Sequence, residues 1–298
     1  MKKVIVIGAD KPIGWTVFSL LTRESDYNVV PVISVDDDVF YYIKNRIIVA
    51  DLYDKKAIKK LILAHNPDVI INCLFDIYKY EVYHIKQDFW HNNYSYVENI
   101  LRAAILSNAH VVTFSSELVF NGANGPYDEE QIQSPLGYIG KTMLAIENFQ
   151  KSLYHNMTVL RLTDYYGFTP FGFNMYLDNI FSKKMIDVET NYHTNPVFID
   201  DIALACLKVI EQSNYGIFNL GGEDYVSKID FIKSIARNNY IFEKKYINEV
   251  TNDIVKKYGL VNLKATINLG INFASLYDGA TSMRFALSSG EKSRFNTL

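Results

Sequence analysis

Cysteine is scarce in this chain of 298 residues, which contains only Cys73 and Cys206. Both lie in apolar surroundings and far apart in the sequence, a pattern that favours buried thiols in a reducing compartment over a disulfide framework. No apolar run approaches the roughly 20 residues that cross a bilayer. The first residues, Met1-Lys2-Lys3, lead straight into a short apolar segment and a glycine, unlike a signal peptide. We therefore predict a soluble, cytoplasmic protein with no membrane partner.

An excess of one charge is also missing. The 30 Lys and Arg residues nearly balance 33 Asp and Glu residues, which gives a formal net charge of -3. A chain without a basic excess is poorly suited to the phosphate backbone of nucleic acids, so we predict no nucleic-acid partner. The six histidines and two cysteines form neither His-x-x-x-His nor Cys-x-x-Cys. Because metal sites need such spacing, we also predict no metal.

Apolar segments of strand length alternate with helix-length segments over the first half of the chain. The opening predicts a strand at 4–7, a tight turn at 8–14, a helix and a second strand at 29–35. Because these strands are continuously apolar, helices must cover both faces of their sheet. The sequence therefore predicts an α/β protein with a doubly wound parallel sheet. Further strands are expected at 46–50, 68–72, 110–115 and 158–162, and helices at 15–23, 55–65, 94–108 and 142–153.

The pattern loosens beyond Gly167, where we expect a second, smaller α/β lobe that binds substrate. The predicted division is a first domain at 1–166, to which 190–220 returns, and a lobe at 167–298. The tail from 262 onward shows no clear periodicity. Ligands of doubly wound sheets bind at the carboxyl ends of the strands, so we expect the site to follow residues 7, 35, 72, 115 and 162. Expected elements of the second half are helices at 175–182, 202–212 and 228–238 and a strand from 216.

A series of motifs occurs in the order seen in one enzyme family. The chain resembles the extended short-chain dehydrogenase/reductases, most closely the dTDP-4-dehydrorhamnose reductases. The resemblance implies a Rossmann domain, a nicotinamide cofactor and a nucleoside diphosphate sugar as substrate. The motifs include Gly8-Ala-x-x-x-x-Gly14, Asp51-x-x-Asp54, Pro67-Asp-Val-Ile-Ile-Asn72, Ser115-Ser-Glu-Leu-Val-Phe-Asn-Gly122, Gly125-Pro-Tyr-Asp-Glu-Glu130, Gly140-Lys-Thr-x-Leu-Ala-x-Glu147, Pro196 to Asp201 and Gly216 to Gly222.

The resemblance also implies where the cofactor would bind, although the phosphate loop departs from the family. Lys11 stands where the family has a middle glycine, and Pro12 removes a backbone donor. Lys11 either pairs with a phosphate or closes the loop to the dinucleotide. Asp36, with Asp37 and Asp38, would contact the adenosine ribose and favour NAD over NADP. The predicted cofactor-binding residues are Gly8, Asp10, Lys11, Ile13, Gly14, Asp36, Asp51, Leu52, Cys73 and Leu74.

The family's catalytic pair is a tyrosine and, four residues later, a lysine that lowers the pKa of the phenol. Aligned through Gly140-Lys-Thr, these positions hold Ile139 and Met143. If one residue is inserted, Tyr138 takes the tyrosine position, but Thr142 then takes that of the lysine. Neither register restores the pair, so the standard chemistry is expected to be lost.

The other family positions give a candidate substrate site. The resemblance makes Ser116 a hydrogen-bond donor to the substrate carbonyl and Tyr138 an off-register acid. Each position also has a simpler interpretation. Ser116 would cap a strand end, Tyr138 would pack against the second lobe and Glu117 would be a solvated carboxylate. Arg161 would be a structural arginine and His193 an exposed loop imidazole. Asp200-Asp201 is expected to cap the helix that follows. The predicted substrate contacts are Glu117, Arg161, Tyr165 and His193.

Two functions are compatible with these residues. The first is a reductase, or less readily an epimerase, acting with NAD or NADP on a 4-keto-6-deoxy sugar linked to a nucleoside diphosphate. The second is a relative without hydride transfer that binds a nucleotide, a nucleotide sugar or a protein and regulates a pathway, as some family members do. The predicted partners are a second copy in a homodimer or a partner enzyme, and the second function predicts that a partner enzyme co-purifies with the chain.

Overall fold

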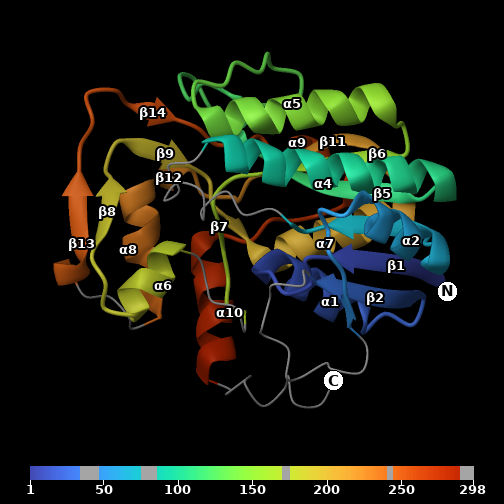
Figure 1. Cartoon of the computed structure of the whole chain (residues 1–298). Coiled ribbons are helices and arrows are strands. Elements are labelled where there is room, and N and C mark those ends of the chain that lie inside the picture. The colour runs from blue at the N-terminus through green and yellow to red at the C-terminus, as the bar shows by residue number, and fades with distance from the viewer. Residues whose placement is uncertain (34–46, 75–85, 170–174, 240–243, 289–298) are drawn as a thin grey trace.

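The computed structural model describes residues 1–33, 47–74, 86–169, 175–239 and 244–288 (Figure 1). Within these ranges a seven-stranded parallel sheet forms the centre of the molecule, in the order β11-β6-β5-β4-β1-β2-β3. This order confirms the predicted Rossmann-type, doubly wound sheet. The strands are β1 (Lys2–Ile7), β2 (Tyr27–Ile33), β3 (Ile48–Val49), β4 (Val69–Asn72), β5 (His110–Ser116), β6 (Met157–Leu162) and β11 (Gly216–Leu220).

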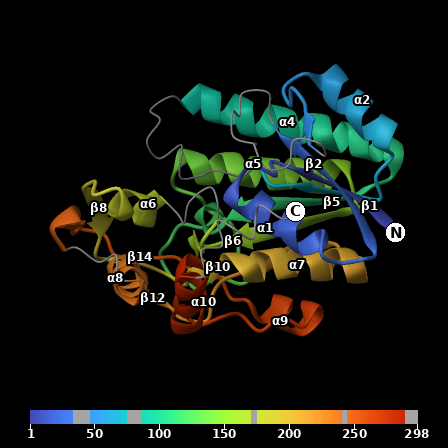
Figure 2. The ribbon, with the colours of Figure 1, turned by 90° about the horizontal axis from the view of Figure 1, so that it is seen from below.

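Helices cover both faces of this sheet, as its continuous apolar strands require. One face carries α1 and α7, and the opposite face carries α2, α4 and α5 (Figure 2). Val4, Ile5, Val6 and Ile7 are completely buried between the two layers. The helices are α1 (Pro12–Leu21), α2 (Lys55–His65), α4 (Lys86–Ser107), α5 (Tyr138–Leu153) and α7 (Ile199–Gln212).

The smaller lobe gathers short strands and helices beside the carboxyl ends of the central strands (Figure 1). It contains a three-stranded sheet in the order β12-β9-β14 and the pair β13-β8, while β10 pairs with β7. Its elements are β7 (Tyr165–Tyr166), α6 (Met175–Phe181), β8 (Ile186–Glu189), β9 (Tyr192–Thr194), β10 (Val197–Phe198), β12 (Val226–Ser227), α8 (Lys228–Asn238), β13 (Ile247–Val250) and β14 (Lys256–Lys257).

The tail is more ordered than the sequence predicted. It forms α9 (Leu263–Leu269), which packs on α7 and β11, and α10 (Leu276–Ser288), which packs on α8. The first helix is only seven residues long and ends at Gly270 with φ 71°, so it is too short to show a helical period. Four other helices begin earlier than predicted: α1 at Pro12, α4 at Lys86, α5 at Tyr138 and α7 at Ile199.

Backbone hydrogen bonds between residues 122–127 and 257–259, which are far apart in the sequence, join the small lobe to the central domain. The amide of Gly125 donates to the carbonyl of Lys257, and the amide of Lys257 donates to the carbonyl of Gly122. The amide of Tyr127 donates to the carbonyl of Gly259 in the same way. Gly122 has φ 70°, and a Cβ there would lie 2.6 Å from the ring of Tyr258. Glycine is therefore needed at this contact.

Candidate functional site

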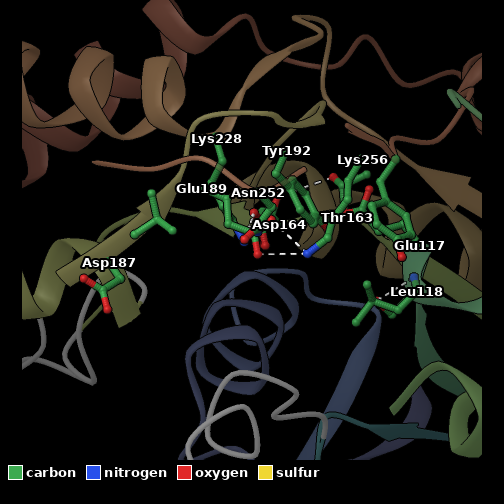
Figure 3. Close-up of a pocket in the computed structure, with 13 residues that line it drawn as sticks. Glu117, Leu118, Thr163, Asp164, Asp187, Glu189, Tyr192, Lys228, Asn252 and Lys256 are labelled. Atoms are coloured by element: carbon green, nitrogen blue, oxygen red, sulfur yellow. Dashed lines mark hydrogen bonds and ion pairs between the residues drawn. The ribbon is translucent and has the colours of Figure 1, made fainter. Parts of the chain in front are cut away.

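A pocket of about 420 Å³ lies between the carboxyl ends of β5 and β6 and the small lobe (Figure 3). This is the edge at which a doubly wound sheet binds its ligands. The central domain contributes Ser116, Glu117, Leu118, Thr163 and Asp164, and the small lobe contributes Asp187, Glu189, Tyr192, Lys228, Val250, Asn252, Lys256 and Tyr258.

Glu117 joins the two lobes at the base of this pocket. Its side chain accepts hydrogen bonds from the hydroxyl of Tyr192 (3.1 Å), the hydroxyl of Thr194 (2.7 Å) and the amide of Gly259 (2.7 Å). The residue is only 2% exposed, so the prediction of a solvated carboxylate was wrong. Burial, aided by the negative charge of Asp164, raises the pKa of Glu117 to about 8 against the opposing effect of these donors.

Two lysines of the small lobe bring positive charge to the pocket. The Nζ of Lys228 lies 3.3 Å from a carboxylate oxygen of Asp164 and 4.4 Å from the ring centroid of Tyr192. Both members of this ion pair are nearly buried, with side chains 8% and 7% exposed. Lys256 donates to both oxygens of Glu189 at 2.8 Å. Neither lysine was foreseen as a site residue.

One local signal could have marked Lys228. Ser227 caps α8 by accepting from the amide of Asp230, and Lys228 is the first helical residue. A cation in the first turn opposes the helix dipole. Such a breach of a local rule is expected at functional positions rather than at structural ones.

Ser116 both lines the pocket and caps the short helix η1 (Glu117–Val119). Its hydroxyl accepts from the amide of Leu118 at 3.2 Å, and the residue is 1% exposed. The strand-end cap expected from the sequence is therefore confirmed. A hydroxyl that accepts through one lone pair keeps its own proton to donate, so the cap leaves Ser116 able to hold a ligand oxygen.

The start of α5 holds the residues from which the sequence predicted the loss of the family's tyrosine and lysine. Tyr138 and Ile139 are the first two residues of the helix and both are half-buried. Met143 is 3% exposed and belongs to the hydrophobic core, whereas Lys141 is exposed to solvent. None of these side chains lines the pocket as the described residues form it. Gly140 holds the helix against η1, because a Cβ there would lie 1.9 Å from the carbonyl oxygen of Leu118.

Two predicted substrate contacts lie elsewhere. Arg161 is fully buried, and its Nε and Nη2 donate to the two oxygens of Glu147 at 3.0 and 2.8 Å. It therefore forms a structural ion pair between β6 and α5. His193 lies on β9 between Tyr192 and Thr194, which both reach Glu117. Because successive strand side chains point to opposite faces, His193 points away from that carboxylate, and its ring stacks near Tyr225.

Tyr165 also lies outside the pocket lining. It is 8% exposed on the short strand β7, which pairs with β10. Its neighbour Tyr166 donates to the carbonyl of Ser275 at 3.3 Å. The sequence predicted that Asp200-Asp201 caps α7, but the cap residue is Phe198. Instead the carboxylate of Asp201 accepts from the amide of Ala274 at 2.9 Å.

The turn between β1 and α1 has the geometry of a dinucleotide site. Gly8 has φ 78°, which favours glycine, and a Cβ on Gly14 would lie 2.0 Å from the carbonyl oxygen of Gly8. Lys11 is the cap residue of α1 and Pro12 its first helical residue. The Nζ of Lys11 lies 2.6 Å from a carboxylate oxygen of Asp10. The tight approach of strand and helix that a pyrophosphate cradle needs is therefore present.

The remaining predicted cofactor residues lie in α1 and in the segments that follow β3 and β4. Ile13, Leu52 and Cys73 are buried, and burial raises the pKa of the Cys73 thiol. Asp51 is exposed and accepts from the amides of Tyr53 and Asp54. The residue after Cys73, Leu74, accepts a hydrogen bond from the Tyr96 hydroxyl at 2.8 Å. Asp36, with the acidic residues that follow it, lies outside the described residues.

These features define a class of protein: a Rossmann domain with a strand–turn–helix dinucleotide cradle, and a small lobe that closes a polar pocket over the carboxyl ends of β5 and β6. The chain belongs to the family described as RmlD substrate binding domain, whose model matches residues 1–256. The predicted kinship with nucleotide-sugar reductases is thereby confirmed at the level of the family.

Solved structures with this fold cover nearly the whole chain. A dTDP-4-dehydrorhamnose reductase from Clostridium acetobutylicum is 23% identical, with a TM-score of 0.78, over 96% of this chain and 99% of that one. The same enzyme from Bacillus anthracis, solved in complex with NADP, is 20% identical over the same shares, with a TM-score of 0.79. UDP-glucose 4-epimerase from Thermotoga maritima, solved with UDP-glucose, is 17% identical over the same shares, with a TM-score of 0.81.

Curated relatives come from a different functional class. Methionine adenosyltransferase 2 subunit beta from Xenopus tropicalis is 28% identical over 200 residues, and that from Rattus norvegicus is 28% identical over 197 residues. Each match covers 62% of this chain and 59% of the relative's length. In the described part of the chain no helix is long and apolar enough to cross a membrane. No group of three potential metal ligands occurs there either.

Proposed function

We propose that this protein binds a nicotinamide dinucleotide at the β1–α1 turn and a nucleoside diphosphate sugar in the pocket between the lobes, without the tyrosine and lysine chemistry of the family. The observation that carries the proposal is the contrast between an intact pocket and the start of α5. The pocket retains Ser116 and Glu117, whereas Ile139 and Met143 occupy the two family positions.

The pocket suits the sugar end of such a ligand. Its volume of about 420 Å³ falls within the range of small-molecule sites. Ser116, Thr163 and Asn252 offer hydroxyl and amide groups that can exchange hydrogen bonds with a polyol. Lys228 and Lys256 can bind a diphosphate if each exchanges its carboxylate partner, Asp164 or Glu189, for a phosphate oxygen.

The loss of standard reduction follows from the chemistry of the missing groups. Without an acid to protonate the oxygen formed by hydride transfer, a rate falls typically about 10²- to 10⁴-fold. Without the lysine, a phenol also keeps its ordinary, high pKa. A thioether at Met143 supplies neither charge nor a proton.

The purified protein should therefore bind the cofactor and the nucleotide sugar but reduce the sugar only slowly. We expect NAD(H) or NADP(H), and dTDP- or UDP-linked sugars, to raise the melting temperature at millimolar concentration because each binds the folded state. Reduction of a 4-keto-6-deoxy sugar nucleotide, followed by absorbance of the reduced cofactor, should be at least about 100-fold slower than in the double variant Ile139→Tyr/Met143→Lys. Melting curves of the double variant provide the folding control.

Two results would contradict this proposal. A melting temperature unmoved by all of these ligands would remove the binding function. Rapid reduction by the unaltered protein would show that another group donates the proton. In that case Tyr138→Phe would test the phenol at the start of α5, with Tyr277→Phe on the exposed face of α10 as the matched control.

A second candidate is a regulatory subunit, which the curated relatives favour because each is named as the β subunit of methionine adenosyltransferase 2. This function predicts a stable complex with a methionine adenosyltransferase catalytic chain from the same cell. Size-exclusion chromatography of the mixed chains, with and without nucleotide, would detect it. Separate elution of the two chains at micromolar concentrations would count against this candidate.

A further inference from the structure

The β1–α1 turn contains an ion pair between two neighbouring residues. Lys11 and Asp10 lie 2.6 Å apart, with side chains 29% and 2% exposed. The carboxylate is therefore inside the turn while the ammonium remains partly accessible. The negative charge of Asp10 also helps to raise the pKa of the Cys73 thiol, after burial and the charge of Cys206. Asp10 thus lies close to the end of β4, in the middle of the edge where a dinucleotide would cross.

The backbone of the turn has few donors left for an anion. Pro12 has no N–H, and the amide of Lys11 donates to the carbonyl of Gly8 at 2.9 Å. The amides of Gly8 and Ala9 both donate to the carbonyl of Val32. In a helix the first amides have no partner within the helix, and in α1 these include the amides of Ile13 and Gly14. A phosphate at this cradle would depend strongly on a side-chain cation.

The two charges of the pair have opposite effects on such a phosphate. A buried carboxylate repels it, and the repulsion is stronger than in water because the local dielectric is low. The ammonium of Lys11 attracts it and has three donors, so it can turn from Asp10 to a phosphate oxygen. The pair holds the lysine in place before the ligand arrives.

We propose that Lys11 is the phosphate-binding side chain of the dinucleotide site and that Asp10 is its internal competitor, which occupies the ammonium until a phosphate displaces it. This inference rests on the proposed dinucleotide site. It resolves the choice left open by the sequence in favour of a lysine that binds the ligand rather than one that blocks the loop. The affinity of the site then depends on the exchange of the Asp10 contact for a phosphate contact.

The test is a direct measurement of binding by isothermal titration calorimetry with NADH and with NADPH. Lys11→Met should weaken binding about 10- to 100-fold, the value of a charge-assisted hydrogen bond. Asp10→Asn should strengthen it about fivefold, because it removes a nearby repulsion and the carboxylate that competes for the ammonium. The double variant should bind more weakly than Asp10→Asn alone, which isolates the lysine contact without leaving an unpaired carboxylate. Lys141→Met, at an exposed position of α5, is the matched control, and melting curves check the folding of each variant.

Comparison of NADH with NADPH identifies the phosphate group that Lys11 contacts. An equal loss with NADH and NADPH would assign Lys11 to a phosphate that both share, and a loss confined to NADPH would assign it to the additional 2'-phosphate. Binding that is unchanged or tighter in Lys11→Met would overturn the inference while leaving the dinucleotide site intact. Absence of binding by the unaltered protein and by every variant would refute the dinucleotide site itself and the inference with it.

Discussion

Arg161→Met should destabilise the folded protein by about 3–5 kcal/mol, although the residue contacts no ligand site. The substitution leaves Glu147 in the interior without its cation, and removal of one member of a buried ion pair typically has an effect of this size. Both side chains are at most 1% exposed, and two hydrogen bonds of 3.0 and 2.8 Å join them. The guanidinium also lies 5.3 Å from the ring centroid of Phe120. Urea denaturation would measure the change.

The double variant Arg161→Met/Glu147→Leu separates an unpaired charge from lost packing. With both charges removed, two apolar side chains face each other in the interior and no charge is left unpaired, so most of the lost stability should return. Lys208→Met breaks the half-exposed pair between Lys208 and Glu211 and should change stability by less than about 1 kcal/mol. A loss below about 1 kcal/mol in Arg161→Met would show that water or another group compensates Glu147.

The stability of the protein should fall as pH rises from about 6.5 to 8, and Glu117 should be responsible. Its pKa rises from 4.5 to about 8 in the folded state, so the folded protein holds this proton more tightly than the unfolded chain does. The stabilisation is complete below pH 4.5 and is lost as pH rises through 8. The maximal slope for one such group is about 1.4 kcal/mol per pH unit.

The chosen pH range separates Glu117 from two other shifted groups. Burial raises the pKa of Asp201 to about 6 and lowers that of His110 to about 4, so both titrate mainly below pH 6.5. Glu117→Gln keeps an oxygen for Thr194 and the Gly259 amide and does not ionise. Its free energy of unfolding, measured by urea denaturation at several pH values, should be nearly flat in this range. An equal slope in the variant and the unaltered protein would assign the dependence to another group.

The central sheet could be predicted because its strands are unambiguous. Val4 to Ile7 and Val69 to Ile71 are continuous apolar runs that only a sheet covered on both faces can bury. The helix starts were less predictable. The start of α5 has Gly137 as its cap residue, without a side-chain hydrogen bond, and therefore lacks the usual capping signal. The strands of the small lobe, such as Tyr192–Thr194, are too short to show a period.

The candidate site was predictable only where it follows a long strand. Ser116 and Glu117 follow β5 directly, and both line the pocket. Lys228 and Lys256 reach it from elements whose positions depend on the packing of the small lobe, which no local pattern reveals. Arg161 matched the family by its place near the end of β6, but it does not line the pocket, and its partner Glu147 lies on a helix that sequence reasoning treated separately.

The backbone bonds between 122–127 and 257–261 limit how a ligand can enter. The small lobe is tied to the sheet there as well as through the chain that follows β7, so it cannot swing outward as a rigid body without breaking those bonds and the contact between Gly259 and Glu117. The opposite wall, formed by β8 and β13, pairs only with itself in the described sheets. Admission and release of a bulky ligand should therefore proceed by displacement of this parallel pair of strands, and amide hydrogen exchange should be faster in the pair than along 257–261.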